Sequence, residues 1–226
     1  MMTIPDSLIF DMDGTLWDAV ASYAEVWNRT LDDLGSDAPR VTYAKLAPLM
    51  GLSLELIAER LFPDGVPEPQ SSFFETLGEN EAYMMPTLGG KLYPGVADTL
   101  RKLKEMGIKL FMVSNCGAAG LPNFVAYTGL GDVFIELLSL GSTGKTKDVN
   151  MRTLIERYSL QSPAYVGDTS GDQQYTRQAG IPFVWASYGF GKDVVGADFT
   201  LNKFTAQTAL PCANIAPRYC FVYSIY

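Results

Sequence analysis

Five short apolar segments, separated by stretches long enough for helices, constrain the fold of this chain more than any other feature. They are "SLIF" at 7–10, "IKLFMV" at 108–113, "FIELLSL" at 134–140, "AYV" at 164–166 and "FVWA" at 183–186. From residue 95 onward, strand and helix therefore alternate along the chain. This alternation predicts an α/β fold with a doubly wound parallel sheet, covered by helices on both faces, and it places ligands at the carboxyl ends of the strands.

The gap between the first two segments is too long for a single crossover helix. Roughly ninety-five residues separate them, whereas a βαβ unit needs about thirty. Segments with helical spacing or helix-capping residues lie within this gap at 18–35, 42–51 and 53–62. The sequence therefore predicts a small α-helical domain at 16–91, inserted into a core domain formed by 1–15 and 92–226.

Charge and composition exclude several classes of protein. The formal net charge is −8 and no dense block of Lys and Arg occurs, which argues against nucleic acid as a partner. No run of about eighteen apolar residues is present, so we expect no membrane span. The cysteines, Cys116, Cys212 and Cys220, are too widely spaced for a metal site or a disulfide scaffold. We therefore expect a cytoplasmic location.

The sequence contains no histidine. This absence excludes the Ser-His-Asp and Cys-His nucleophilic sites, zinc bound through imidazole, and imidazole as a general acid or base. Any catalysis must therefore use carboxylates, lysine, hydroxyl groups and a hard metal ion.

Acidic residues follow the first and fourth apolar segments, where strands are expected to end. "FDMDGT" carries Asp11 and Asp13, and "GDTSGD" carries Asp168 and Asp172. Because alternate residues of a strand face opposite ways, the Gly-Thr pair after Asp13 must turn the backbone if both acids are to face one cavity. Acids in these positions can form a nucleophile with its general acid, or can bind Mg²⁺.

Two further motifs supply hydroxyl, amide and ammonium groups. Ser114 and Asn115 follow the second segment and suit the oxygens of a phosphate. "GKTKD" places Lys145 and Lys147 before a helix that Asp148 is expected to cap, and a lysine at such a junction can neutralise a phosphoryl group. Spacing alone leaves both lysines open, and we favour Lys147 because a residue beside a helix start is better fixed.

Each motif alone could instead cap a helix or lie on a solvated surface, but a doubly wound sheet brings all four to one edge. Their combination resembles the haloacid dehalogenase superfamily of phosphotransferases. Its four signatures are matched by "DMDGT", "VSN", a lysine of "GKTK" and "GDTSGD". The resemblance spans residues 7–200 and implies a Rossmann-like core. The helical insert resembles the α-helical cap of the first type, as in phosphoglycolate phosphatases and β-phosphoglucomutases.

The resemblance implies catalytic roles for the matched residues. Asp11 would be the nucleophile that forms an aspartyl-phosphate, and Asp13 would protonate the leaving alcohol and then activate water. Ser114 would hydrogen-bond the phosphoryl group and Asn115 would help to shape that loop, so both are assigned to substrate binding. The motif lysine would balance the negative charge, because a carboxylate approaches a phosphate dianion only when cations screen the repulsion.

The same resemblance implies a Mg²⁺ site. The ion would be held by Asp11, the backbone carbonyl of Asp13, and Asp168, while Asp172 would order the metal-bound waters and the lysine. With Lys147 as the motif lysine, Lys145 is assigned to substrate binding.

We therefore expect a Mg²⁺-dependent phosphatase that acts on a small phosphomonoester such as phosphoglycolate or a sugar phosphate, as a monomer or weak homodimer. Haloalkanoate dehalogenases lack the acid that corresponds to Asp13, so dehalogenation is disfavoured. A β-phosphoglucomutase-like phosphomutase is the main alternative, although those mutases share a cap histidine that this chain lacks. A third hypothesis is an inactive phosphate-binding module. The full set of acids and lysine argues against it.

Substrate selectivity is expected to lie in the insert. Candidate contacts, each more often a surface or packing residue, are Trp17, Asp18, Lys45, Arg60 and Lys91. Beyond about residue 210, two prolines and the loss of helical periodicity predict a poorly packed tail.

Overall fold

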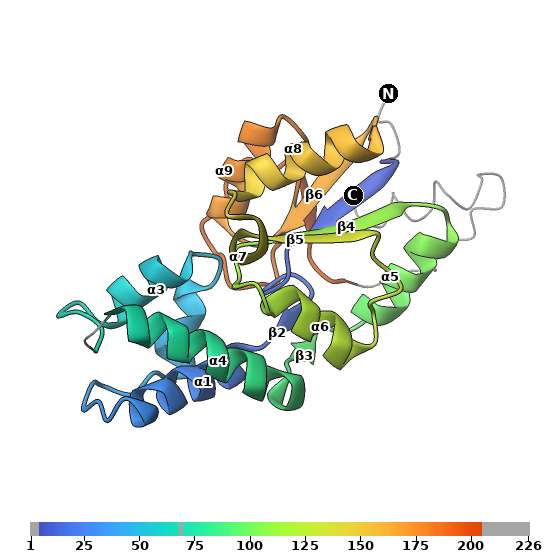
Figure 1. Cartoon of the computed structure of the whole chain (residues 1–226). Coiled ribbons are helices and arrows are strands. Elements are labelled where there is room, and N and C mark those ends of the chain that lie inside the picture. The colour runs from blue at the N-terminus through green and yellow to red at the C-terminus, as the bar shows by residue number, and fades with distance from the viewer. Residues whose placement is uncertain (1–4, 68–69, 205–226) are drawn as a thin grey trace, which may run out of the picture.

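A six-stranded, wholly parallel sheet forms the centre of the computed structural model, which describes residues 5–67 and 70–204 (Figure 1). The strand order is β5-β4-β1-β6-β7-β8. The strands are β1 (Ser7–Phe10), β4 (Lys109–Ser114), β5 (Glu136–Ser139), β6 (Pro163–Gly167), β7 (Phe183–Ala186) and β8 (Phe199–Leu201). The predicted doubly wound parallel sheet is confirmed, and each of the five apolar segments forms one of its strands.

Helices cover both faces of the sheet. On β1, Leu8 and Phe10 belong to one buried cluster while Ile9 belongs to the other, as the two-residue period of a strand requires. The second cluster includes side chains of α8 (Lys147–Tyr158) and α9 (Ser170–Ala179). The first includes side chains of α5 (Val96–Glu105) and α6 (Gly120–Thr128), which Figure 1 shows on the opposite face.

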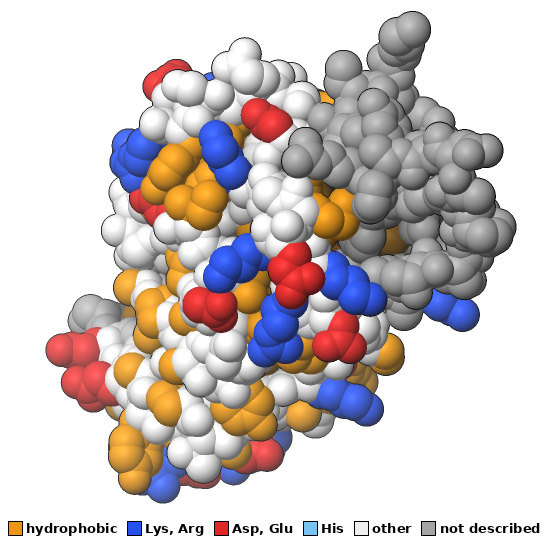
Figure 2. Space-filling view, turned by 90° about the vertical axis from the view of Figure 1, so that its right-hand side faces the viewer, with side chains coloured by type: hydrophobic (Ala, Val, Ile, Leu, Met, Phe, Trp, Pro, Cys, Tyr) orange, Lys and Arg blue, Asp and Glu red, His pale blue; other side chains and the backbone are white. Residues whose placement is uncertain are grey.

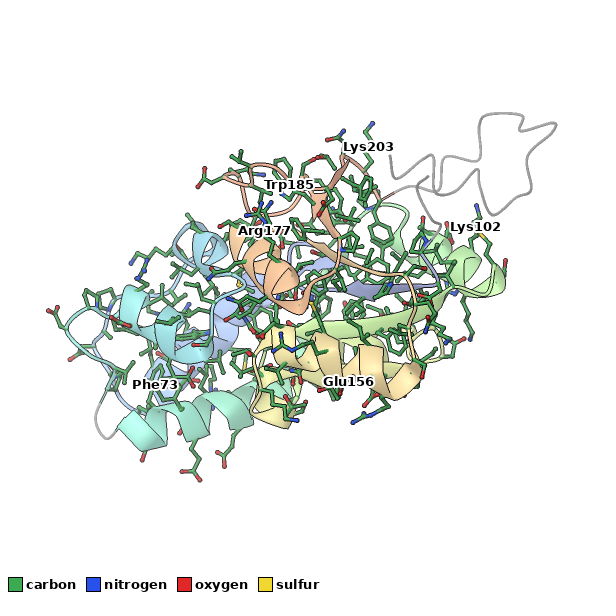
Figure 3. All side chains as sticks on the ribbon, turned by 90° about the horizontal axis from the view of Figure 1, so that it is seen from above. Phe73, Lys102, Glu156, Arg177, Trp185 and Lys203 are labelled. Atoms are coloured by element: carbon green, nitrogen blue, oxygen red, sulfur yellow. The ribbon has the colours of Figure 1, made fainter. Side chains whose placement is uncertain are left out.

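The segment between the first two strands of the sheet is helical. Its elements are α1 (Val20–Asp33), α2 (Tyr43–Leu46), the 3-10 helix η1 (Ala47–Leu49), α3 (Leu54–Leu61) and α4 (Gln70–Leu88). Trp27, Phe62 and Phe73 pack together at its centre, with ring centroids 5.8 to 6.1 Å apart. Figure 3 shows Phe73 at the opposite end of the molecule from Lys102 of α5. The helices therefore form a group beside the sheet.

Two short antiparallel strands, β2 (Trp17–Asp18) and β3 (Lys91–Leu92), lie side by side where the chain leaves the sheet and where it returns. The insert thus leaves and rejoins the rest of the chain through one paired crossing. These strands agree with the boundaries predicted at 16–91, but the division into two domains remains a prediction.

The start of α8 differs in detail from the prediction. The helix begins at Lys147 with Thr146 as its N-cap residue, and Asp148 lies in the first turn. Asp148 accepts hydrogen bonds from the Thr146 hydroxyl and from Arg152 instead of capping the backbone. The prediction of Asp148 as the cap was therefore wrong by two residues, because Thr146 already adopts the extended backbone of a cap.

The surface carries mixed charge. On the face in Figure 2, acidic and basic side chains are interspersed with hydrophobic ones. None of the helices in the described ranges combines the length and hydropathy that a membrane crossing requires. The tail predicted to pack poorly beyond about residue 210 lies outside the described residues.

Candidate active site

The predicted motifs converge at the carboxyl edge of the sheet. Asp11 follows the last residue of β1, and β1 lies between β4, which ends at Ser114, and β6, which ends at Gly167. Phe10 is in register with Met112 on one side and with Val166 on the other. The loops after these three strands therefore leave the sheet at the same level, at the position where a doubly wound sheet binds ligands.

A buried ion-pair network lies at this edge. Lys147 Nζ is 2.8 Å from Asp11 Oδ1 and 2.6 Å from Asp172 Oδ1, and all three side chains are at most 2% exposed. Tyr165 donates its phenolic hydrogen bond to the backbone oxygen of Val113 and also lies 3.3 Å from Asp172 Oδ1. Of the two candidate lysines, the structure brings Lys147 to Asp11, whereas Lys145 is exposed.

A tight turn positions Asp13. Gly14 has a φ of +81°, a conformation that glycine adopts without strain, and its N–H donates to the Trp17 carbonyl. The Trp17 indole N–H in turn donates to Asp13 Oδ1 at 2.9 Å. Trp17 is fully buried, with its ring edge-on to Phe124. The sequence suggested Trp17 as a substrate contact, but in the structure it orients Asp13.

Asp168 is held by a segment that sequence reasoning missed. Asp168 Oδ2 accepts hydrogen bonds from the backbone N–H groups of Phe190 at 2.7 Å and Gly191 at 3.3 Å. The indole of Trp185, labelled in Figure 3, donates to the Asp168 backbone oxygen. A Cβ atom at Gly14 would lie 2.3 Å from Asp168 Oδ2, so only glycine fits there. The sequence feature that could have indicated this segment is the "GFG" run at 189–191.

Asp172 stands at the start of α9. Its Oδ2 accepts hydrogen bonds from the backbone N–H and the hydroxyl of Thr169, and Thr169 Oγ1 accepts one from the Asp172 N–H, which completes a capping box. Since Oδ1 pairs with Lys147, both carboxylate oxygens have protein partners. Asp172 is therefore arranged to fix the lysine and the helix start.

Burial and crowding perturb the acids of the site. Burial, opposed by Lys147, raises the pKa of Asp11 to about 6. Burial and the neighbouring Asp11 raise the pKa of Asp13 well above its usual range, so that Asp13 favours the protonated form. Burial, Asp172 and Asp11 raise the pKa of Asp168 to about 8. Burial acts against ionisation of Asp172 as well, but Lys147 outweighs it and lowers that pKa.

Three of these acids fit a divalent cation. Asp11, Asp168 and Asp172 each offer an oxygen within 4.8 Å of the others. Asp11 Oδ2 is buried and has no hydrogen-bond partner among the described residues, and Asp168 Oδ1 has only the Thr15 hydroxyl at 3.5 Å. One ammonium group cannot neutralise this cluster, and Mg²⁺ binds through one or two carboxylates together with waters. The donor set therefore suits Mg²⁺.

The loop after β4 contacts both the site and the insert. Ser114 is buried beside Asp11 in the cavity, and its hydroxyl accepts a long hydrogen bond of 3.4 Å from the Cys116 N–H. Asn115 donates through its amide to the backbone oxygen of Gly51 at 2.8 Å. This hydrogen bond joins the loop to the insert, while substrate binding by Asn115 stays a prediction.

A cavity of about 600 Å³, its mouth included, opens between the insert and this edge of the sheet. Asp11, Asp13 and Ser114 line one end, and Glu81 of α4 lies on the insert side. Burial raises the pKa of Glu81 to about 7. The sequence did not indicate Glu81, because Gly78 and Pro86 interrupt the pattern of the helix that carries it.

Comparisons with known proteins agree with this site. Residues 8–186 match the model of the haloacid dehalogenase-like hydrolases. The chain belongs to that family. Phosphoglycolate phosphatase of Rhodobacter capsulatus is 30% identical over 91% of this chain and 94% of its own length. A plasmid-encoded phosphoglycolate phosphatase of Cupriavidus necator is 28% identical over 93% and 95%.

The fold has close counterparts among solved structures of this family. The crystal structure of a predicted phosphoglycolate phosphatase from Haemophilus somnus superposes with a TM-score of 0.79 at 23% identity, over 90% of this chain and 96% of that one. The predicted haloacid dehalogenase fold is thereby confirmed. The enzyme class predicted from the sequence, a phosphatase, agrees with the family and with these relatives.

Replacing Lys147 with methionine tests the buried ion-pair network. The substitution leaves Asp11 and Asp172 buried without their cation, so we expect the free energy of unfolding to fall by about 3 kcal/mol or more. Denaturant unfolding in buffer containing a chelator measures the loss. Lys145→Met is the matched control and is expected to change stability by at most about 0.5 kcal/mol. Equal effects of the two substitutions would contradict the assignment.

Proposed function

We propose that this protein hydrolyses a small phosphomonoester with Mg²⁺ and forms an aspartyl-phosphate on Asp11. The observation that carries the proposal is the placement of Asp11, paired with Lys147, beside Asp13 at the end of a cavity. The relatives named above are phosphoglycolate phosphatases, which supports a small phosphomonoester as the type of substrate.

In the first step, Asp11 attacks phosphorus. A bond forms between a carboxylate oxygen and phosphorus while the ester P–O bond breaks, and the leaving oxygen takes the proton of Asp13. Trp17 holds Asp13 in the turn beside Asp11. Lys147 offsets the charge of Asp11 as the phosphate approaches, and Mg²⁺ held by Asp11, the Asp13 carbonyl and Asp168 supplies further electrostatic stabilisation when bound.

In the second step, Asp13 works as a base. Its carboxylate removes a proton from water, the water oxygen attacks phosphorus, and the bond to Asp11 breaks to release phosphate. Asp13 then holds the proton that the next cycle needs. The pKa of Asp13 is raised well above its usual range, and that of Asp11 is raised to about 6. These shifts suit the two roles, because Asp13 must be protonated while Asp11 is ionised.

The remaining predicted residues take supporting roles. Ser114 lines the same cavity as Asp11, which supports a role in binding a phosphoryl oxygen. Asn115 fixes the loop through Gly51, and we assign it to positioning. Lys145 is exposed, and a substrate contact for it would require movement of its loop.

We propose that the helices at 16–91 act as the cap of the site and that 1–15 and 92–226 form the catalytic core. The paired strands β2 and β3 and the Asn115–Gly51 hydrogen bond support this division, since they join the two parts beside the cavity.

The phosphomutase alternative remains weaker, because it needs a cavity that holds a second phosphate. Such a site requires basic side chains.

Asp11→Asn is expected to abolish the turnover of p-nitrophenyl phosphate with Mg²⁺. Loss of the nucleophile should lower kcat by at least about 10³-fold. Asp98→Asn, at an exposed acid of α5, is the matched control and should keep normal activity. Hydrolysis by the Asp11 variant at the normal rate would exclude the aspartyl-phosphate. A wild-type protein without turnover on any phosphate ester would favour the binding module.

Asp13→Asn should distinguish a general acid from a merely structural group. A stable leaving anion such as p-nitrophenolate needs little protonation, whereas an alkoxide needs it fully. We expect kcat/KM to fall by about 10² to 10⁴-fold for glycerol phosphate and much less for p-nitrophenyl phosphate. Equal losses for both esters would show that Asp13 does not protonate the leaving group.

A further inference from the structure

Glu81 is a buried carboxylate that the proposed chemistry does not use. Its side chain is 6% exposed, and Oε1 has no hydrogen-bond partner among the described residues. It reaches from α4 to the loop after β4, since a Cβ atom at Gly117 would lie 3.5 Å from Glu81 Oε2. A buried acceptor without a donor costs stability, so this oxygen is suited to a donor that a ligand brings.

Glu81 lines the same cavity as the reacting acids. Tyr23 and Trp27 of α1 and Leu77 of α4 line the same space. These side chains, with Asp11 and Asp13, enclose one cavity. A phosphate ester bound with its phosphoryl group at Asp11 would therefore hold its leaving group in a cavity that Glu81 and apolar side chains line.

The cavity lacks the cations that a second anionic group needs. Among the described residues, its lining includes three acids, Asp11, Asp13 and Glu81, and no lysine or arginine. The basic residues that the sequence suggested as substrate contacts, Lys45, Arg60 and Lys91, are exposed and do not line it. A carboxylate or second phosphate in the leaving group would thus find no cationic partner among the described lining residues, which disfavours such substrates.

We infer that Glu81 accepts a hydrogen bond from a hydroxyl or ammonium group of the leaving alcohol, and thereby selects phosphomonoesters that carry such a donor and no second anion. This inference rests on the proposed phosphatase function and specifies its substrate class. Phosphoglycolate, which appears in the names of the relatives, ends in a carboxylate and falls outside this class. Amino alcohol and polyol phosphates fall within it.

Four esters test the selectivity of the wild-type enzyme with Mg²⁺. Glycerol phosphate offers hydroxyl groups, ethanolamine phosphate an ammonium group, phosphoglycolate a carboxylate, and p-nitrophenyl phosphate serves as the reference for the reaction itself. We expect kcat/KM for at least one of the first two esters to exceed that for phosphoglycolate by about tenfold or more, since one hydrogen bond to a buried charge contributes this much. The ratio of kcat/KM for glycerol phosphate to that for ethanolamine phosphate shows whether the donor is a hydroxyl or an ammonium group.

Substitution of Glu81 then links the selectivity to this residue. Glu81→Gln keeps the shape but removes the charge, and its amide can donate to a carboxylate. We expect the preference over phosphoglycolate to fall by about tenfold, with the larger loss for ethanolamine phosphate if the donor is an ammonium group. Glu79→Gln, at an exposed position of the same helix, is the matched control and should keep the wild-type preference.

The outcomes separate the inference from the proposed function. Turnover of p-nitrophenyl phosphate together with a preference for phosphoglycolate would overturn the inference and leave the phosphatase intact. An unchanged preference in Glu81→Gln would also overturn it. If none of the four esters is hydrolysed, the proposed phosphatase function is itself contradicted. If Glu81→Gln fails to fold, the wild-type ranking of the esters decides alone.

Discussion

The arrangement of the site depends on one buried ammonium group. Lys147 Nζ lies within 2.8 Å of two carboxylates from different parts of the chain, Asp11 after β1 and Asp172 in the first turn of α9. Desolvation of these charges is costly, and only their mutual attraction and further hydrogen bonds offset it. The position of α8 relative to the sheet is thus tied to the acids, and the remaining negative charge suits a divalent cation.

The sequence predicted those site residues whose side-chain chemistry and position after a strand are both visible in one short motif. Asp11, Asp13 and Asp168 follow strands, and the period of the apolar segments was enough to place those strands. It missed Trp17 as the partner of Asp13 and Phe190 as a donor to Asp168, because both act through contacts that only the turn geometry creates. The paired strands β2 and β3 have two residues each, too few for any periodic signal.

The insert was harder to predict than the sheet. Its three predicted segments match α1, α2 with η1, and α3, but α4 contains Gly78 and Pro86 and shows no clear amphipathic period. That helix carries Glu81, which depends on tertiary burial for its character. The proposed division would keep the reacting groups on the edge of the sheet and leave selectivity to the helices of the insert.

The central claim is that the phosphoryl group passes through Asp11. The most direct measurement is acid quenching of the enzyme during turnover of a phosphate ester with Mg²⁺, followed by proteolysis and mass spectrometry of the peptides. We expect a phosphoryl group on the peptide that contains Asp11, formed at least as fast as turnover and absent from the Asp11→Asn variant. Turnover without any phosphorylated peptide, or with the phosphoryl group on another residue, would contradict it.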